Sequence, residues 1–178
     1  MIFNELKIPG AYEIYPEIFA DERGFFARSW CSKEFASHGL SPILAQCNIS
    51  ASTRQGTLRG MHFQAPPYAE SKLVRCTKGS IYDVVLDLRP QSPTFKKWAA
   101  VTLTAPKHNM IYIPEGCGHG FMTLEDDIEI FYQMSEFYTP EAGRGVRWDD
   151  PAFQIEWPGE VRVISERDRT YPDFELPR

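Results

Sequence analysis

The stretch GTLRGMHFQAPPYAESK, residues 56–72, is the starting point for predicting the fold. Apolar, strand-like residues stand on both sides of a loop that two adjacent prolines break. We interpret the stretch as two strands joined by that loop, an arrangement that aims Arg59, His62 and Lys72 at a common point. A base, an anion-binding guanidinium and an ammonium at one point suit proton abstraction next to a carbonyl on a phosphorylated substrate.

Further strand signals, each short and bounded by turn residues, recur along the chain. The predicted strands are residues 13–19, 43–52, 72–76, 79–88, 99–103, 109–113, 119–124 and 128–134, the last as the hairpin partner of the one before it. A brief helix is predicted within residues 29–38, ended by Gly39, and the segment from residue 140 onward is loop-rich. This spacing predicts an all-β sandwich or barrel with a few short helices, as one domain over residues 1–178.

Composition narrows the function classes. With 43% hydrophobic and 24% charged residues the chain is ordinary globular protein, and its net charge of −5 gives no reason to expect a nucleic-acid partner. No apolar run approaches the roughly 20 residues that a membrane-spanning helix needs, and the first residues show no signal pattern. The four cysteines are scattered without a CxxC pair, which favours reduced, cytoplasmic thiols.

Two histidine spacings are similar to those of the cupins. The pattern G-x5-H ends at His62, and P-x-G-x2-H ends at His119. Metal-binding cupins have His-x-His in the first motif, whereas the position two residues after His62 is Gln64, a poor ligand. The scaffold therefore resembles a cupin, and we predict no metal.

The chain as a whole resembles the nucleotide-sugar 3,5-epimerases typified by dTDP-4-dehydrorhamnose 3,5-epimerase. The matching runs are DERGFF (21–26), QCN (46–48), TLRGMHFQ (57–64), KLVR (72–75), SPTF (92–95), IPEG (113–116) with HGF (119–121), and RWDDP (147–151). The resemblance implies a cupin-type jelly-roll β-sandwich that forms a homodimer, uses no cofactor and binds a nucleotide-sugar substrate.

The resemblance also assigns chemical roles. A 4-keto group acidifies the hydrogens on the flanking sugar carbons, so a base, an acid on the opposite face and a donor at the enolate oxygen can invert C3, C5 or both. By resemblance, His62 is the base, Asp168 orients it, Tyr132 is the acid and Lys72 stabilises the enolate oxygen. The sugar and diphosphate are held, again by resemblance, by Arg23, Gln46, Asn48, Arg59, Lys72, His119 and Arg167.

Two positions depart from the family pattern. Arg28 and Gly143 stand where family members often have glutamates. The proposed proton-transfer residues are unaffected, but the two changes leave open whether the nucleotide base and the exact sugar are those of dTDP-4-keto-6-deoxyglucose.

Two further hypotheses stand beside the epimerase. One is a metal-dependent small-molecule cupin enzyme, which stoichiometric iron, manganese or zinc in the purified protein would favour and Gln64 disfavours. The other is a non-catalytic sugar-nucleotide-binding cupin, against which the presence of both His62 and Tyr132 argues.

Overall fold

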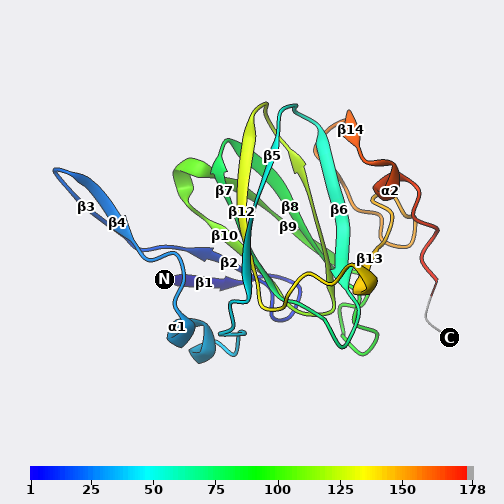
Figure 1. Ribbon diagram of the computed structural model, residues 1–178, viewed down its shortest axis with the longest axis horizontal. Helices are drawn as coiled ribbons and strands as arrows, with labels where there is room; N and C mark the ends of the chain where they lie inside the picture. Colours follow the sequence, from blue (N-terminus) through cyan, green and yellow to red (C-terminus); the bar gives the residue numbers. More distant parts are fainter. Residues whose placement is uncertain (176–178) are drawn as a thin grey trace.

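Two six-stranded sheets face each other in the computed structural model, which describes residues 1–175 (Figure 1). The first sheet has the strand order β1 (Ile2–Glu5), β2 (Tyr12–Tyr15), β10 (Met110–Ile113), β7 (Lys72–Lys78), β12 (Ile128–Met134) and β5 (Gln46–Ser52). The second has the order β13 (Gly143–Gly145), β6 (Thr57–Gln64), β11 (Cys117–Thr123), β8 (Ser80–Asp87) and β9 (Trp98–Thr104), with β14 (Val163–Ile164) parallel to β6. The predicted all-β sandwich is confirmed.

The remaining elements are short. They are the hairpin β3 (Ile18–Asp21) and β4 (Gly24–Ala27), the helices α1 (Ser32–Ser37) and α2 (Glu166–Arg169), and the 3-10 turns η1 (Ala105–Lys107) and η2 (Pro140–Ala142). Helix α1 lies within the predicted residues 29–38, and Gly39 follows its last turn with a positive φ of 71°. Glycine takes that conformation without the steric cost of a Cβ, so the predicted helix end is confirmed.

The core lies between the two sheets, where side chains of alternate residues meet. Ile128 and Ile130 of β12 are buried, as are Val74 of β7 and Val85 of β8. Burying each such side chain stabilises the fold by about 1.5–3 kcal/mol. The packed core holds the strands in a fixed register, and that register determines which polar side chains meet at the open end.

One predicted pairing is wrong. Residues 128–134 do form a strand, β12, but it pairs with β5 and β7 instead of forming a hairpin with β11, which belongs to the other sheet. The short connection through Glu125, Asp126 and Asp127 carries the chain from one sheet to the other, with Asp127 at a φ of 53°. Alternation of apolar and polar residues identifies a strand but carries no information about its partner.

The predicted strand over residues 13–19 is two strands. Strand β2 ends at Tyr15 and β3 begins at Ile18, because buried Pro16 has no N–H to donate to a sheet. The β3–β4 hairpin then projects away from the two sheets (Figure 1). Its exposed side chains include Phe19 and Phe26.

The C-terminal part is more regular than the predicted loop-rich segment. Strands β13 and β14 both pair with β6, and α2 follows directly after β14. Among residues 1–175, no helix has the length and apolar character to cross a bilayer. All four cysteines are free thiols.

Candidate active site

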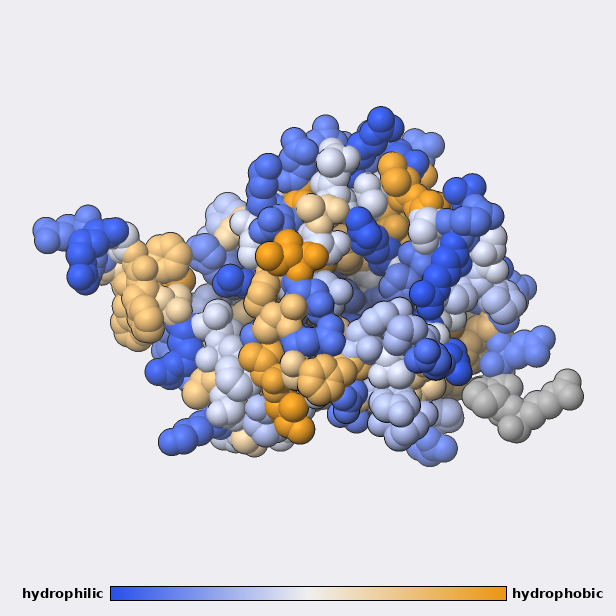
Figure 2. Space-filling view, in the orientation of Figure 1, coloured by the Kyte–Doolittle hydropathy of each residue, from blue (hydrophilic) through white to orange (hydrophobic). Residues whose placement is uncertain are grey.

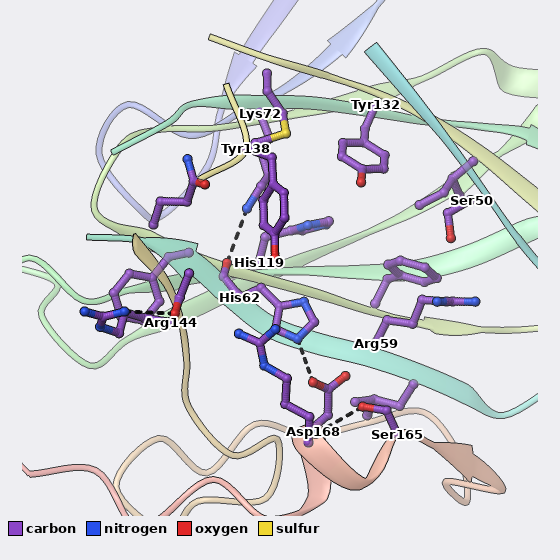
Figure 3. Close-up of a pocket in the computed structure, with 18 of the residues that line it drawn as sticks. Ser50, Arg59, His62, Lys72, His119, Tyr132, Tyr138, Arg144, Ser165 and Asp168 are labelled. Carbon is purple, nitrogen blue, oxygen red and sulfur yellow. Dashed lines mark hydrogen bonds and ion pairs between the residues drawn. The ribbon is translucent and has the colours of Figure 1, made fainter. Parts of the chain in front are cut away.

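A cavity of about 630 Å³ opens between the two sheets at the ends of β6, β7 and β12. Its volume lies within the range typical of small-molecule sites. Seven of the ten predicted site residues line it: Arg59, His62, Lys72, His119, Tyr132, Arg167 and Asp168. Both sheets therefore contribute to one site, as Figure 3 shows.

His62 and Asp168 form a close histidine–carboxylate pair in this cavity. His62 Nε2 lies 2.6 Å from Asp168 Oδ1, although the residues are 106 positions apart in the chain. An imidazole whose Nε2–H faces a carboxylate keeps the lone pair on Nδ1. The side chain of His62 is 41% exposed, so the ring is open to a ligand in the cavity.

Asp168 is held in place by the start of helix α2. Ser165 caps the helix by accepting a hydrogen bond from the Asp168 backbone N–H, and Asp168 Oδ2 accepts one from the Gly60 N–H at 3.2 Å. Burial raises the pKa of Asp168, but the hydrogen bond and charge of His62 and the other donors outweigh it, so the pKa lies below its ordinary value. Asp168 is therefore an anion that fixes the imidazole.

Gly60, next to this pair, is required by a close approach of two strands. It has a φ of 128°, and a Cβ built on it would lie 2.8 Å from the His119 carbonyl oxygen and still closer to Gly120. No other residue fits without moving β11. The glycine thus explains part of the LRGMH motif: it lets β6 and β11 come together where both histidines enter the cavity.

Tyr132 enters the cavity from the other sheet. It lies on β12, and its ring and hydroxyl project into the space above His62 and Arg59 in Figure 3. Burial raises the pKa of Tyr132, and the nearby charge of Arg59 partly opposes that shift. The phenol therefore carries its proton at neutral pH and is able to donate it.

Lys72 begins β7 and is paired with a residue that the sequence analysis missed. Lys72 Nζ lies 2.6 Å from Glu70 Oε1, and both side chains are almost fully buried. Glu70 Oε2 also accepts a hydrogen bond from the Gln64 backbone N–H. The pair leaves the ammonium at the wall of the cavity, beside the His62 carbonyl oxygen at 3.4 Å.

His119 belongs to a second histidine–aspartate pair. Its Nε2 lies 3.0 Å from each carboxylate oxygen of Asp83, which is fully buried. Burial raises the pKa of Asp83, and the charges of His119 and Lys72 act against this shift. In the pairing of β11 with β6, His119 lies directly opposite His62.

Three arginines supply positive charge around the mouth of the cavity: Arg59, Arg144 and Arg167. Arg59 donates to Ser52 Oγ and to the Ala51 carbonyl, and Arg167 donates to Tyr171 Oη at 2.7 Å. Guanidinium groups bind phosphate oxygens in pairs of hydrogen bonds. Arg144 was not predicted, and its only signal was its place beside Gly143 in the family pattern.

The other three predicted residues do not line this cavity. Gln46 and Asn48 lie beside it on β5, joined by a 3.2 Å hydrogen bond, and Gln46 Oε1 accepts from the Tyr138 N–H. Their predicted common face on the strand is confirmed. Arg23 is at the tip of the β3–β4 hairpin, 85% exposed and paired with Asp21, away from the cavity of its own chain.

The two departures from the family pattern lie in different places. Gly143 lines the cavity, where an added Cβ would lie 3.6 Å from an Arg167 amino group and 4.0 Å from Tyr138 Oη. Arg28 follows the hairpin and pairs with Glu34 at 2.7 Å.

Gln64, a poor metal ligand, has a structural task. It is buried, its amide nitrogen donates to the Tyr68 and Phe137 carbonyls, and its oxygen accepts from the Thr139 N–H at 2.6 Å. The side chain thereby joins the loop after β6 to the segment after β12. Within residues 1–175, no group of three His, Cys, Asp or Glu side chains is placed to hold a metal ion.

Similarity to known proteins agrees with this geometry. A family model described as dTDP-4-dehydrorhamnose 3,5-epimerase matches residues 5–175. The chain belongs to that family. Its predicted membership, and with it the class of isomerases, is confirmed.

Individual family members match over nearly their full length. The dTDP-4-dehydrorhamnose 3,5-epimerase of Sinorhizobium fredii is 42% identical over 99% of this chain and 92% of its own. The crystal structure of the same enzyme from Elizabethkingia anophelis has a TM-score of 0.95 at 35% identity, covering 98% of this chain and 96% of its own. The cupin-type jelly roll is thereby confirmed.

A third relative in the family has a narrower named activity. ChmJ of Streptomyces bikiniensis, described as a 3'-monoepimerase and crystallised with dTDP-quinovose, has a TM-score of 0.88 at 33% identity. The alignment covers 96% of this chain and 86% of ChmJ. Epimerases of one centre and of two centres thus share this fold.

Proposed function

We propose that the protein epimerises a nucleotide-linked 4-keto-6-deoxy sugar by removing a proton next to the keto group and returning one on the opposite face. The observation that supports this most directly is the entry of His62 and Tyr132 into one cavity from opposite sheets (Figure 3). Inversion of a carbon needs a base and an acid on its two faces. These two side chains, on separate walls, supply that arrangement.

His62 is the base in this proposal and Asp168 its partner. The lone pair on Nδ1 takes the proton from C3 or C5, and the anionic Asp168, 2.6 Å from Nε2, stabilises the imidazolium that results. The electron pair of the broken C–H bond moves into the C=C bond of an enolate, and the negative charge passes to the former keto oxygen.

Lys72 and Tyr132 complete the cycle. The Lys72 ammonium, held by Glu70 at 2.6 Å, neutralises the enolate oxygen. Tyr132 then gives its proton to the carbon from the far side. The Tyr132 phenolate takes a proton from water and the His62 imidazolium releases one to water through the open cavity, which restores both groups. Arg59, Arg167 and His119 hold the diphosphate and the sugar hydroxyls.

Proton NMR in D2O tests the proposal. With dTDP-4-keto-6-deoxyglucose as substrate, we expect deuterium to enter at a carbon flanking the keto group, and His62→Ala to abolish this entry. Deuterium at both C3 and C5 identifies a double epimerase, and deuterium at one carbon identifies an enzyme of the monoepimerase kind. Full exchange by the folded His62→Ala variant would contradict the assigned base.

Gly143 and Arg28, the two departures from the family pattern, bear on which nucleotide the substrate carries. The names of the relatives place thymidine diphosphate first in any test. Affinities for dTDP, CDP, GDP and UDP, measured by calorimetry, decide whether the base is thymine. A clear preference for dTDP removes the hypothesis that the two departures change the nucleotide.

We also propose a homodimer in which the β3–β4 hairpin reaches a second copy. The hairpin stands away from the sheets and exposes Ile18, Phe19, Phe25 and Phe26, and β5 exposes Ile49 along the edge of its sheet (Figures 1 and 2). Apolar patches of this kind mark interfaces. In such a dimer, Arg23 of one copy would reach the cavity of the second copy and bind the anionic part of the substrate there.

Sedimentation at micromolar concentration checks the dimer. The variant Phe19→Asp with Phe26→Asp is expected to sediment as a monomer.

A cytoplasmic location is part of the same proposal, supported by the four free thiols.

A further inference from the structure

We infer that Tyr171 is a positioning residue with two separable tasks: its ring fixes the His62–Asp168 pair, and its hydroxyl fixes Arg167. The inference rests on the proposed function, since it concerns how that site is assembled. Tyr171 lies two residues beyond α2, and neither the motifs nor the resemblance singled it out.

The ring of Tyr171 lies in a notch that one glycine creates. Gly145 of β13 is paired in register with His62 of β6, and a Cβ built on Gly145 would overlap the Tyr171 ring. The ring therefore lies directly over the backbone beside the base. Its centroid is 6.5 Å from that of the His62 ring at 68°, an edge-to-face arrangement.

The hydroxyl of Tyr171 has a different partner. It accepts the 2.7 Å hydrogen bond from Arg167 Nε, and the Arg167 guanidinium carbon lies 5.8 Å from the Tyr171 ring centroid. With Nε occupied in this way, a phosphate would bind Arg167 through its terminal amino groups, on the side where Tyr138 also interacts with the guanidinium. Burial raises the pKa of Tyr171, with Arg167 acting against that shift, so the phenol stays neutral at neutral pH.

Hydrogen bonds and an ion pair hold the residues around Tyr171 against the rest of the protein, so the position of the ring is fixed. Arg147 donates to the Tyr171 carbonyl at 3.3 Å and pairs with Asp173 at 2.7 Å. The Phe174 N–H donates to buried Asp150 at 2.6 Å. Four residues of α2 are thus held between β14 on one side and this anchored segment on the other.

The Tyr171 ring therefore aligns the two functional side chains of α2, Asp168 and Arg167. Asp168 points to His62 and Arg167 lies along the ring face, while the four-residue helix itself is too short to be rigid alone. Removing the ring takes the edge-to-face contact from His62, the partner of Asp168, and the ring face from Arg167. Removing only the hydroxyl frees Arg167.

The test compares Tyr171→Phe and Tyr171→Leu in the solvent-deuterium assay, with Tyr82→Phe as matched control. Tyr82 is a partly buried tyrosine that packs on Trp157, outside the cavity. Tyr171→Phe is expected to raise KM about fivefold and keep kcat within about twofold, since only the orientation of a phosphate ligand is lost. Tyr171→Leu is expected to raise KM similarly and also to lower kcat at least about tenfold.

A second variant guards against loss of folding. Gly145→Ala displaces the ring without altering it, so it should lower kcat like Tyr171→Leu; thermal unfolding of every variant shows which are folded. Wild-type kcat and KM in folded Tyr171→Leu or Gly145→Ala would overturn the inference, as would an equal loss of kcat in Tyr171→Phe. The His62→Ala benchmark separates the two proposals, because its full activity would refute the proposed base regardless of Tyr171.

Discussion

The two histidine–aspartate pairs of the site share a geometry and differ in burial. His62 and His119 lie opposite each other on β6 and β11, and each has a carboxylate on Nε2. The side chain of His62 is 41% exposed and that of His119 is 11% exposed. The same pair of residue types thus forms one open pair and one closed pair.

The aspartates respond in opposite directions. The pKa of Asp83 is raised, because its burial outweighs the charge and hydrogen bonds of His119, whereas that of Asp168 is lowered, because His62, Gly60 and Ser165 together outweigh its burial. The number of donors around a buried carboxylate decides which effect wins. The open pair suits proton transfer, and the closed pair suits a fixed contact with the substrate.

The largest expected effect separates the two histidines. His62→Ala should lower kcat by about 10³ with little change in KM, since general-base catalysis contributes 10²–10⁴. His119→Ala should mainly raise KM. Steady-state kinetics of both variants check this, and an equal fall in kcat for the two would remove the distinction between the pairs.

Asp168→Asn is expected to lower kcat by about 10², because the imidazolium loses its anionic partner while the hydrogen-bonding shape remains. The measurement is kcat at saturating substrate, with circular dichroism to show that the fold persists. A variant with unchanged kcat would mean that Asp168 only supports α2.

Asp87 extends the comparison along the strand that carries Asp83. It is equally buried but accepts from Arg89, Ser92 and Thr94, which outweigh desolvation and lower its pKa from 3.8 to about 2. A lowered pKa stabilises the fold above pH 3.8, and this stabilisation is lost as pH falls through about 2. Asp87→Asn should therefore cost about 2 kcal/mol of unfolding free energy at pH 7, with kcat unchanged.

Urea unfolding across pH checks the Asp87 effect. The difference between wild type and Asp87→Asn should shrink as the solution is acidified below pH 3.8. A constant difference at all pH values would assign the effect to packing instead of charge.

The smallest expected effect is that of Asp83, whose contribution to the unfolding free energy changes with pH in the opposite direction from that of Asp87. Because the folded pKa of Asp83 is raised, its contribution to stability is greatest below the ordinary value of 3.8 and declines as pH rises through the raised value. Wild type should therefore lose stability relative to Asp83→Asn as the pH rises from 3.8 through the raised pKa. The same urea series measures it, and a gain on raising the pH would contradict the assigned direction.

Much of the fold followed from sequence pattern, and its errors have a common cause. Strand positions such as 128–134 were correct because alternation of side chains is local. The partner of that strand was wrong because pairing is decided by the collapse of two sheets around one core. Pro16 split a strand whose apolar residues had seemed continuous.

The cavity shows the same division. Family motifs named His62, Lys72, Tyr132 and Asp168, and the structure places all four in one cavity. The motifs gave no signal for Glu70 or Tyr171. They also assigned Arg23 to the substrate site, although it lies away from the cavity of its own chain.

By itself, the sequence determined the scaffold, the family and the types of chemical group available, because these depend on residue identity at fixed spacing. Only the tertiary structure decided which carboxylate meets which histidine, which ring lies over Gly145 and how open each pair is. Those properties depend on contacts between residues far apart in the chain, 26 positions for Gly145 and Tyr171 and 106 for His62 and Asp168. They also depend on local burial, which sets the strength of every charge in the site.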